Sequence, residues 1–126
     1  MKQPISEDAL RALQRNMFDY FLRESNPQNG LVRDKTEERS PASIAVVGFA
    51  LAAYPIGVER GFMTRAEAVE LTLATLRFFS NSAQGTEPDA TGYKGFYYHF
   101  WTWKPDGAFG TVSCPPSIRR FCSPEC

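Results

Sequence analysis

The stretch SPASIAVVGFALAAYPIGVERG, residues 40–61, decides the expected fold of this chain. From Ile44 to Tyr54 it carries no charged side chain, and its four alanines and one glycine keep the segment thin. A helix that lacks a polar side is expected to be buried on all sides. A bundle of three helices is too small to surround one of its own members. The stretch therefore predicts an all-α protein with two layers and many helices.

The limits of this helix follow from the residues that flank it. Ser40 and Pro41 are expected to open it, with serine as the N-cap and proline at the first helical position. Gly61 is expected to close it, because glycine readily takes the left-handed conformation found just after many helices.

Amphipathic helices are predicted on both sides of the apolar one. The first runs from Ser6, as the N-cap, to about Glu24, and it ends before Pro27, which disfavours helical geometry at the preceding residue. Its apolar residues recur at three- and four-residue spacing: Leu10, Leu13, Met17, Phe18 and Phe21. The other begins with a T-x-x-E capping box formed by Thr64 and Glu67. The side that we expect to pack against the apolar helix consists of Val69, Leu73, Leu76 and Phe79.

The remaining segments are expected to be turns, loops and short extended pieces. Asn26 to Gly30 forms a turn that leads into an extended segment, residues 31–34, and residues 81–92 form a loop. Gly95 to Phe100 reads as a short extended segment rich in aromatic residues. Residues 101–126 lose all periodicity and contain four of the nine prolines, so no helix or strand is predicted there.

Composition excludes several classes of protein. With 126 residues the chain holds one domain, and its 14 basic residues equal its 14 acidic ones, which argues against a nucleic-acid partner. The spacing of Cys114, Cys122 and Cys126 fits neither a disulfide framework nor the usual zinc patterns, and the single His99 lies far upstream. We therefore expect no metal and no cofactor. A redox or metal-binding module built on the cysteines is the weakest of the alternatives.

The N-terminus and the apolar stretch indicate where in the cell the chain is expected to be located. No apolar run follows Lys2, so a secretory signal is not predicted, and the stretch from Ile44 to Ile56 is shorter than the ~20 residues that span a bilayer. The chain as written is expected to be cytoplasmic, without a membrane partner.

Four strings of sequence carry a family resemblance: NPQNGLVRDK, SPASIAVVGFALAAYPIGVERGFMTRAEA, LATLRFF and PDATGYKGFYYHF. They resemble the opening portion of the bacterial glucoamylase-like glycoside hydrolase family, whose known members include enzymes acting on β-1,2-linked glucans. The resemblance covers roughly Ala9 to Phe100 and implies part of an (α/α)6 toroid. About three helices and the aromatic extended segment are expected, with residues 1–100 as the N-terminal part of the domain. An intact parent of this family could be periplasmic or secreted.

The resemblance stops after Phe100, where the family continues with a segment close to LDMxTGRRxWNCELSTIDxALLLAG. Here the chain reads WTWKPDGAFGTVSCPPSIRRFCSPEC instead. If one cytidine is restored between codons 100 and 101, the tail can be back-translated so that it reads LDMETGRRVWNCELSTIDSAFLLAGV. Residues 101–126 are therefore expected to be an out-of-frame tail without regular structure. The alternative is a divergent natural C-terminus.

Glycoside hydrolysis needs two carboxyl groups that flank the scissile bond. The candidate carboxylates are Asp34 and Asp89, both in loops. The alternatives are that Asp34 is a solvated charge and that Asp89 braces a turn. The resemblance further implies that a sugar-binding pocket wall would be lined by Arg33, Tyr93, Lys94, Tyr97 and His99. Tyr97 and His99 alternate, so they are expected to share one face of a strand, where core packing and sugar stacking both fit. The alternative for Lys94 is simple exposure to solvent.

The function expected from the sequence is that of an enzyme fragment. The parent would act on a glucan oligosaccharide or polysaccharide, while this chain alone is expected to be inactive because most of the pocket is missing. Its exposed apolar surface is expected to promote self-association or aggregation. The alternative is a small helical module that binds carbohydrate or protein without catalysis. Linkage specificity and the retaining or inverting outcome stay open.

Overall fold

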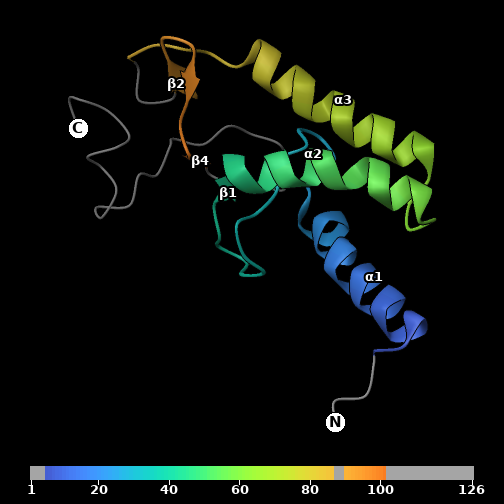
Figure 1. Cartoon of the computed structure of the whole chain (residues 1–126). Helices are drawn as coiled ribbons and strands as arrows, with labels where there is room; N and C mark the ends of the chain where they lie inside the picture. The colour runs from blue at the N-terminus through green and yellow to red at the C-terminus, as the bar shows by residue number, and fades with distance from the viewer. Residues whose placement is uncertain (1–4, 87–89, 102–126) are drawn as a thin grey trace.

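A computed structural model describes residues 5–86 and 90–101, which form three helices and four two-residue strands (Figure 1). The helices are α1 (Glu7–Glu24), α2 (Ile44–Glu59) and α3 (Arg65–Asn81). The strands are β1 (Ala42–Ser43), β2 (Gly92–Tyr93), β3 (Phe96–Tyr97) and β4 (Phe100–Trp101). The helix α2 contacts both α1 and α3, and it lies in the middle of the molecule (Figure 1). The predicted all-α character is confirmed for these ranges.

The caps of α1 and α3 are where the sequence predicts them. The Ser6 hydroxyl accepts a hydrogen bond from the Ala9 amide at 3.2 Å. At the start of α3 the Thr64 hydroxyl accepts from the Glu67 amide at 3.2 Å, and the Glu67 carboxylate accepts from the Thr64 amide at 2.7 Å. These contacts satisfy amide donors that have no partner inside a helix.

The predicted start of α2 is wrong by several residues. Its N-cap is Ser43 and not Ser40, because Ala42 and Ser43 form β1 and pair with β4 in antiparallel register. Ser40 instead closes the preceding loop, where its hydroxyl accepts a hydrogen bond from the Lys35 amide at 3.1 Å. The end of α2 is as predicted, since Gly61 has a φ of 70° just beyond the helix.

Two glycines let the helices pack closely. A Cβ atom on Gly57 of α2 would lie 2.1 Å from the ring of Phe18 on α1. A Cβ atom on Gly30, in the turn after α1, would lie 2.0 Å from the hydroxyl and 2.6 Å from the backbone nitrogen of Thr75 on α3. The Thr75 hydroxyl donates to the Gly30 carbonyl at 3.2 Å. The core therefore forms where α1, this turn and α3 meet α2, around the buried Tyr54.

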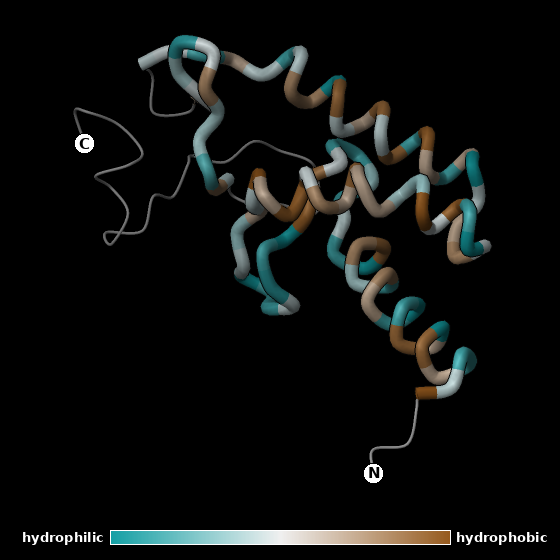
Figure 2. The backbone as a smooth tube through the Cα atoms, in the orientation of Figure 1, coloured by the Kyte–Doolittle hydropathy of each residue, from teal (hydrophilic) through white to brown (hydrophobic). Residues whose placement is uncertain are grey.

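The helices bury only part of the faces expected: Phe79 of α3 and Phe21 of α1 pack against the core, but most of the other apolar residues of the expected rows are exposed. In α3 the buried residues are Ala68, Thr75 and Phe78, whereas Val69, Leu73 and Leu76 are 40 to 53% exposed. The small Ala68 and Thr75 let α3 approach its neighbours closely, which explains the choice of face. In α1 only Phe18 is buried, and the exposed residues include Leu10, Leu13 and Met17. Figure 2 shows hydrophobic positions along all three helices and a hydrophilic loop between α1 and α2.

The aromatic segment is not one strand. Phe96 and Tyr97 pair with β2 in a hairpin, and Phe100 and Trp101 pair with β1 in a separate sheet. Trp101 is only 2% exposed, and its indole Nε1 donates to the Thr91 carbonyl at 3.2 Å. The regular structure thus extends one residue into the tail that was expected to lack it. Residues 102–126, with the three cysteines, lie outside the described residues.

Candidate functional site

The first candidate segment is the loop between Leu31 and Ala42, which carries Arg33 and Asp34. Its two ends are held together because Arg33 bridges to Ala42 and the Asp34 amide donates to the Pro41 carbonyl at 2.8 Å. This loop therefore leaves the core at β1 and returns to it there, beside the C-terminal end of α1 (Figure 1).

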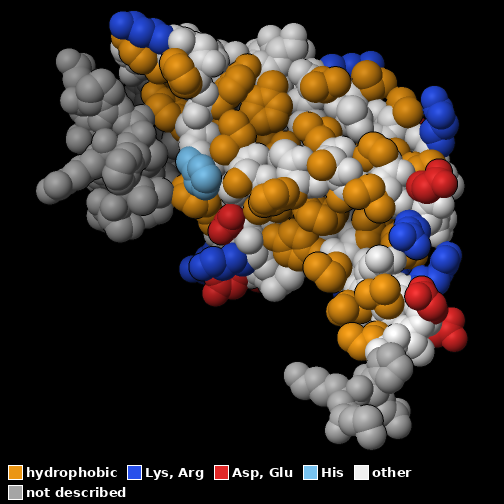
Figure 3. Space-filling view, in the orientation of Figure 1, with side chains coloured by type: hydrophobic (Ala, Val, Ile, Leu, Met, Phe, Trp, Pro, Cys, Tyr) orange, Lys and Arg blue, Asp and Glu red, His pale blue; other side chains and the backbone are white. Residues whose placement is uncertain are grey.

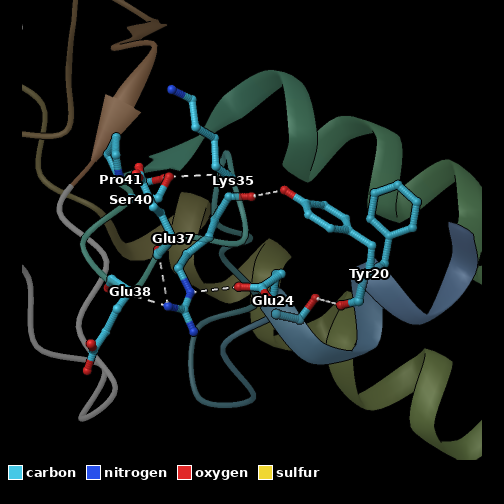
Figure 4. A network of polar contacts seen from close by, with 10 residues as sticks. Tyr20, Glu24, Lys35, Glu37, Glu38, Ser40 and Pro41 are labelled. Carbon is cyan, nitrogen blue, oxygen red and sulfur yellow. Dashed lines mark hydrogen bonds and ion pairs between the residues drawn. The ribbon is translucent and has the colours of Figure 1, made fainter. Parts of the chain in front are cut away.

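A network of polar contacts anchors this loop to α1. The guanidinium Nε of Arg33 lies 2.9 Å from the carboxylate of Glu24, and both side chains are largely buried, at 18% and 13% exposure. The Arg33 Nη1 donates to the carbonyls of Glu37 and Glu38, each at 3.4 Å. The Tyr20 hydroxyl donates to the Arg33 carbonyl at 2.6 Å. Figure 4 shows Tyr20 and Glu24 facing this loop from the end of α1.

The Arg33 side chain therefore braces the loop from within. A buried ion pair with further hydrogen bonds positions a loop well, because breaking it would leave a charge uncompensated. The sugar-binding role expected for Arg33 remains a prediction, and the contacts found for its guanidinium are with the chain itself.

Asp34 is half-buried and lies within electrostatic reach of the same network. Burial raises the pKa of Tyr20 above its usual value, and the negative charges of Glu24 and Asp34 raise it further. Asp89, the other candidate carboxylate, falls outside the described residues.

The hairpin of β2 and β3 carries a second group of candidates. Its turn residues Lys94 and Gly95 both have positive φ, 49° and 88°, as a tight two-residue hairpin turn requires. The Lys94 ammonium lies 5.1 Å from the centre of the Tyr93 ring. Phe96, which the sequence did not single out, is 80% exposed. The hairpin thus presents a cation and an aromatic ring to solvent.

Tyr97 and His99 do not share one strand face, contrary to expectation. Tyr97 ends β3, and its hydroxyl donates to the Phe79 carbonyl at 2.9 Å while its ring packs edge-on against Phe79 at 4.8 Å. His99 is exposed at a bend before β4, and its ring packs edge-on against Phe100 at 4.4 Å. The chain turns here because β4 must leave the hairpin to reach β1. Core packing therefore accounts for Tyr97.

Sequence reasoning missed Glu24 and Tyr20. The one available signal was their spacing of four residues on α1, which places both on the same side of the helix. In the described ranges, no group of three His, Cys, Asp or Glu side chains is arranged to hold a metal ion. None of the helices in residues 5–86 and 90–101 is long and apolar enough to cross a membrane.

Comparison with known proteins identifies the architecture. No family model and no curated protein matches the chain. The crystal structure of a "putative glucoamylase" from Bacteroides uniformis ATCC 8492 superposes with a TM-score of 0.61 at 31% sequence identity, over 80% of this chain and 24% of that one. A "putative glucoamylase" from Bacteroides fragilis NCTC 9343 superposes with a TM-score of 0.60 at 24% identity, over 79% of this chain and 24% of that one, which shows the fold alone.

The resemblance to the glucoamylase-like family is thereby confirmed, and so is the expected partial all-α fold. The chain spans about a quarter of the length of the two structures that it matches.

Proposed function

We propose that this chain is a segment of a glycoside hydrolase that acts on glucans, and that the chain alone does not hydrolyse them. The observation that carries the proposal is the uneven coverage of the match. Four fifths of this chain corresponds to only a quarter of a glucoamylase-like protein. A toroid pocket draws residues from all of its helix pairs, so a quarter of the fold supplies a minor part of the pocket wall.

The carboxyl groups support the same conclusion. Hydrolysis requires one carboxyl group to protonate the leaving oxygen and another to activate water or attack the sugar. Asp34 is the candidate carboxylate in the described residues, and the neighbouring Glu24 is engaged by Arg33 in an ion pair that anchors a loop. The acidic residues that the restored reading frame would encode are absent from the chain as written.

The proposal is tested by measuring sugar released from β-1,2-glucan and from a panel of α-glucans. The purified chain is expected to release no more than a heat-inactivated blank. The Asp34→Asn variant serves as the control for a contaminating hydrolase. Release by the chain that is lost in Asp34→Asn would overturn the claim that the chain is inactive.

We also propose that the reading frame changes after Phe100. The restored frame would place leucine at position 101, which is buried and occupied by Trp101 in this chain, so an apolar side chain suits the site in both frames. Mass spectrometry of the protein in its host distinguishes them through the tryptic peptide that follows Lys94. A peptide that begins GFYYHFLDM shows that the host translates the restored frame. One that begins GFYYHFWTW shows that the tail is translated as written, and the proposal then requires the family's remaining helices to be encoded downstream in another frame.

The second candidate function is carbohydrate binding without catalysis. The exposed Phe96 favours it, together with Lys94 and Tyr93 on the same hairpin, because flat aromatic rings provide apolar faces for sugars. Affinity electrophoresis in gels that contain β-1,2-glucan tests this function. Retardation that is lost in Phe96→Ala and kept in Phe49→Ala, an exposed phenylalanine on α2, would favour a binding module.

A further inference from the structure

A cleft lies between the turn after α1 and one side of α3, and we call it the α3 cleft. Its volume is about 630 Å³, within the range of pockets that hold small molecules. Its lining includes two residues of the turn and four of the helix: Gln28, Asn29, Glu70, Leu73, Arg77 and Asn81. In the described part of the chain the α3 cleft shares no residue with the Arg33 loop or with the hairpin.

The two walls of the α3 cleft are held at a fixed spacing. The Thr75 hydroxyl donates to the Gly30 carbonyl at 3.2 Å, and Gly30 lies so close to α3 that a Cβ atom would meet the Thr75 hydroxyl at 2.0 Å. On the wall formed by the turn, the side-chain oxygen of Asn29 accepts a hydrogen bond from the Leu31 amide at 3.0 Å. This bond orients the Asn29 carboxamide and leaves its two N–H donors for a ligand. The cleft is therefore pre-formed, which lowers the entropy cost of binding.

The charged side chains of the α3 cleft keep their hydrogen-bonding capacity. Glu70 and Arg77 are exposed, and neither side chain forms an ion pair or a hydrogen bond within residues 5–86 and 90–101. They are seven residues apart, so they lie on the same face of α3 at a separation of roughly 10 Å along the helix axis. Leu73 lies between them and is 40% exposed, which gives the cleft an apolar floor.

This surface differs in chemistry from the neighbouring ones. Figure 3 shows hydrophobic side chains gathered over α2 and α3 on the side that it presents. The α3 cleft instead combines an apolar floor with a carboxylate, a guanidinium and three carboxamides. A carboxylate accepts hydrogen bonds, a guanidinium donates them and a carboxamide does both. These groups match a ligand that has apolar ring faces and many hydroxyl groups.

Charge and length narrow the choice of ligand further. The lining has no net charge, because Glu70 is its one acidic residue and Arg77 its one basic residue. An anion would be repelled by Glu70 and a cation by Arg77, whereas a neutral sugar would be repelled by neither. From Glu70 to Asn81 the helix rises by roughly 16 Å, which suits a short oligosaccharide better than a single sugar ring.

We propose that the α3 cleft binds a glucan oligosaccharide at a site separate from the loop and the hairpin that carry the candidate pocket residues. The choice of a glucan among neutral, hydroxyl-rich ligands rests on the proposed function. Hydrolysis is not expected at this site, because it needs two carboxyl groups and the lining supplies only Glu70. The α3 cleft would hold a glucan chain without cleaving it.

Nuclear magnetic resonance of the full, isotope-labelled chain tests the proposal. The probes are β-1,2-linked glucotriose and maltotriose at millimolar concentrations, and γ-aminobutyrate serves as a zwitterionic comparison. We expect at least one of the two sugars to cause saturable shifts in the side-chain amides of Gln28, Asn29 and Asn81 and in the α3 backbone between residues 70 and 81. We expect γ-aminobutyrate to cause no saturable shift.

Two matched substitutions on α3 locate the site. Arg77→Ala removes a donor from the cleft, whereas Arg65→Ala removes an exposed arginine of the same helix that does not line it. Arg77→Ala should weaken sugar binding about tenfold, the loss expected when a hydrogen bond to a charged group is removed, and Arg65→Ala should change it by less than about twofold. Both side chains are exposed, so neither change disturbs the core, and the α3 amide signals check this in the same spectra.

The proposal is overturned if neither sugar causes saturable shifts, or if Arg77→Ala binds as tightly as Arg65→Ala. It is also overturned if the shifts are confined to residues 92–97 and disappear in Phe96→Ala, because the hairpin is then the binding site. Binding of γ-aminobutyrate in place of the sugars would show that the ligand is a zwitterion. The sugar-release assay is independent of these results: release of sugar contradicts only the proposed inactivity, and failure to bind contradicts only the α3 cleft.

Discussion

Replacing Gly30 by alanine should loosen the contact between the turn after α1 and the helix α3. Two penalties apply. The backbone of Gly30 has a φ of 69°, where a residue with a Cβ atom is disfavoured by about 1 kcal/mol. The new Cβ atom would also lie 2.0 to 2.8 Å from three atoms of Thr75, so α3 must move and the hydrogen bond from the Thr75 hydroxyl to the Gly30 carbonyl is lost. Overpacking of this kind costs about 1–3 kcal/mol.

Gly61→Ala is the matched control. Gly61 has a nearly identical φ of 70°, but a Cβ atom there would meet nothing within 4 Å. It should therefore show only the backbone penalty of about 1 kcal/mol. The difference between the two variants isolates the packing penalty, about 2 kcal/mol, which corresponds to roughly a 30-fold change in an opening equilibrium.

Amide hydrogen exchange is the suitable assay, because it reports local opening and does not need a cooperative transition of the whole chain. Protection of the α3 amides should fall about 30-fold further in Gly30→Ala than in Gly61→Ala. Adding Thr75→Ala should not rescue Gly30→Ala, since the backbone nitrogen and Cα of residue 75 remain at 2.6 and 2.8 Å. Equal protection in the two glycine variants would refute the packing argument.

Three further predictions use the same assay. Gly57→Ala should destabilise the contact between α1 and α2 by about 1–3 kcal/mol, because the new Cβ atom would meet the Phe18 ring. Gly48→Ala, where a Cβ atom meets nothing, should stabilise α2 by about 0.5–1 kcal/mol. If Gly48→Ala is the more destabilising of the two variants, α1 does not cross α2 at Gly57. Glu24→Gln should loosen the loop that carries Arg33 by about 3 kcal/mol, because it leaves a largely buried charge uncompensated. Arg23→Gln, whose ion pair with Asp19 spans 3.8 Å at the surface, should change the opening of that loop by less than about 0.5 kcal/mol. Hydrogen bonds from the Thr64 amide and hydroxyl lower the pKa of the Glu67 carboxyl. The stabilisation of α3 by this carboxylate is therefore complete above the ordinary pKa of 4.5 and is lost as the pH falls through the lowered pKa. In Glu67→Gln the first turn of α3 should show no such loss.

The features that could be predicted from the sequence are local ones. Ser6, Thr64 and Glu67 form hydrogen bonds with amides within three residues of themselves, so their pattern alone identifies where α1 and α3 begin. The same holds for Gly61, whose conformation is set by the end of its own helix. The strings of sequence that resemble the glucoamylase-like family are likewise visible without a structure.

The start of α2 could not be predicted because its cause is remote in sequence. Ser40 and Pro41 have the pattern of a helix start, but Ala42 and Ser43 pair with residues almost sixty positions away. Helical spacing shows that Val69 and Leu73 lie on one face, but not which apolar face the described neighbours cover. The position of Arg33 depends on Glu24 at the end of α1, and no spacing rule links residues in a helix to those in the loop beyond it.

Resequencing the gene through codon 100 and several hundred bases beyond the stop codon tests the central claim most directly. The claim predicts that the new sequence contains one additional cytidine after codon 100, or that the remaining glucoamylase-like helices are encoded downstream in another frame. If the frame is confirmed and no helical coding sequence follows in any frame, the tail is genuine, and the reading of this chain as a hydrolase segment is contradicted.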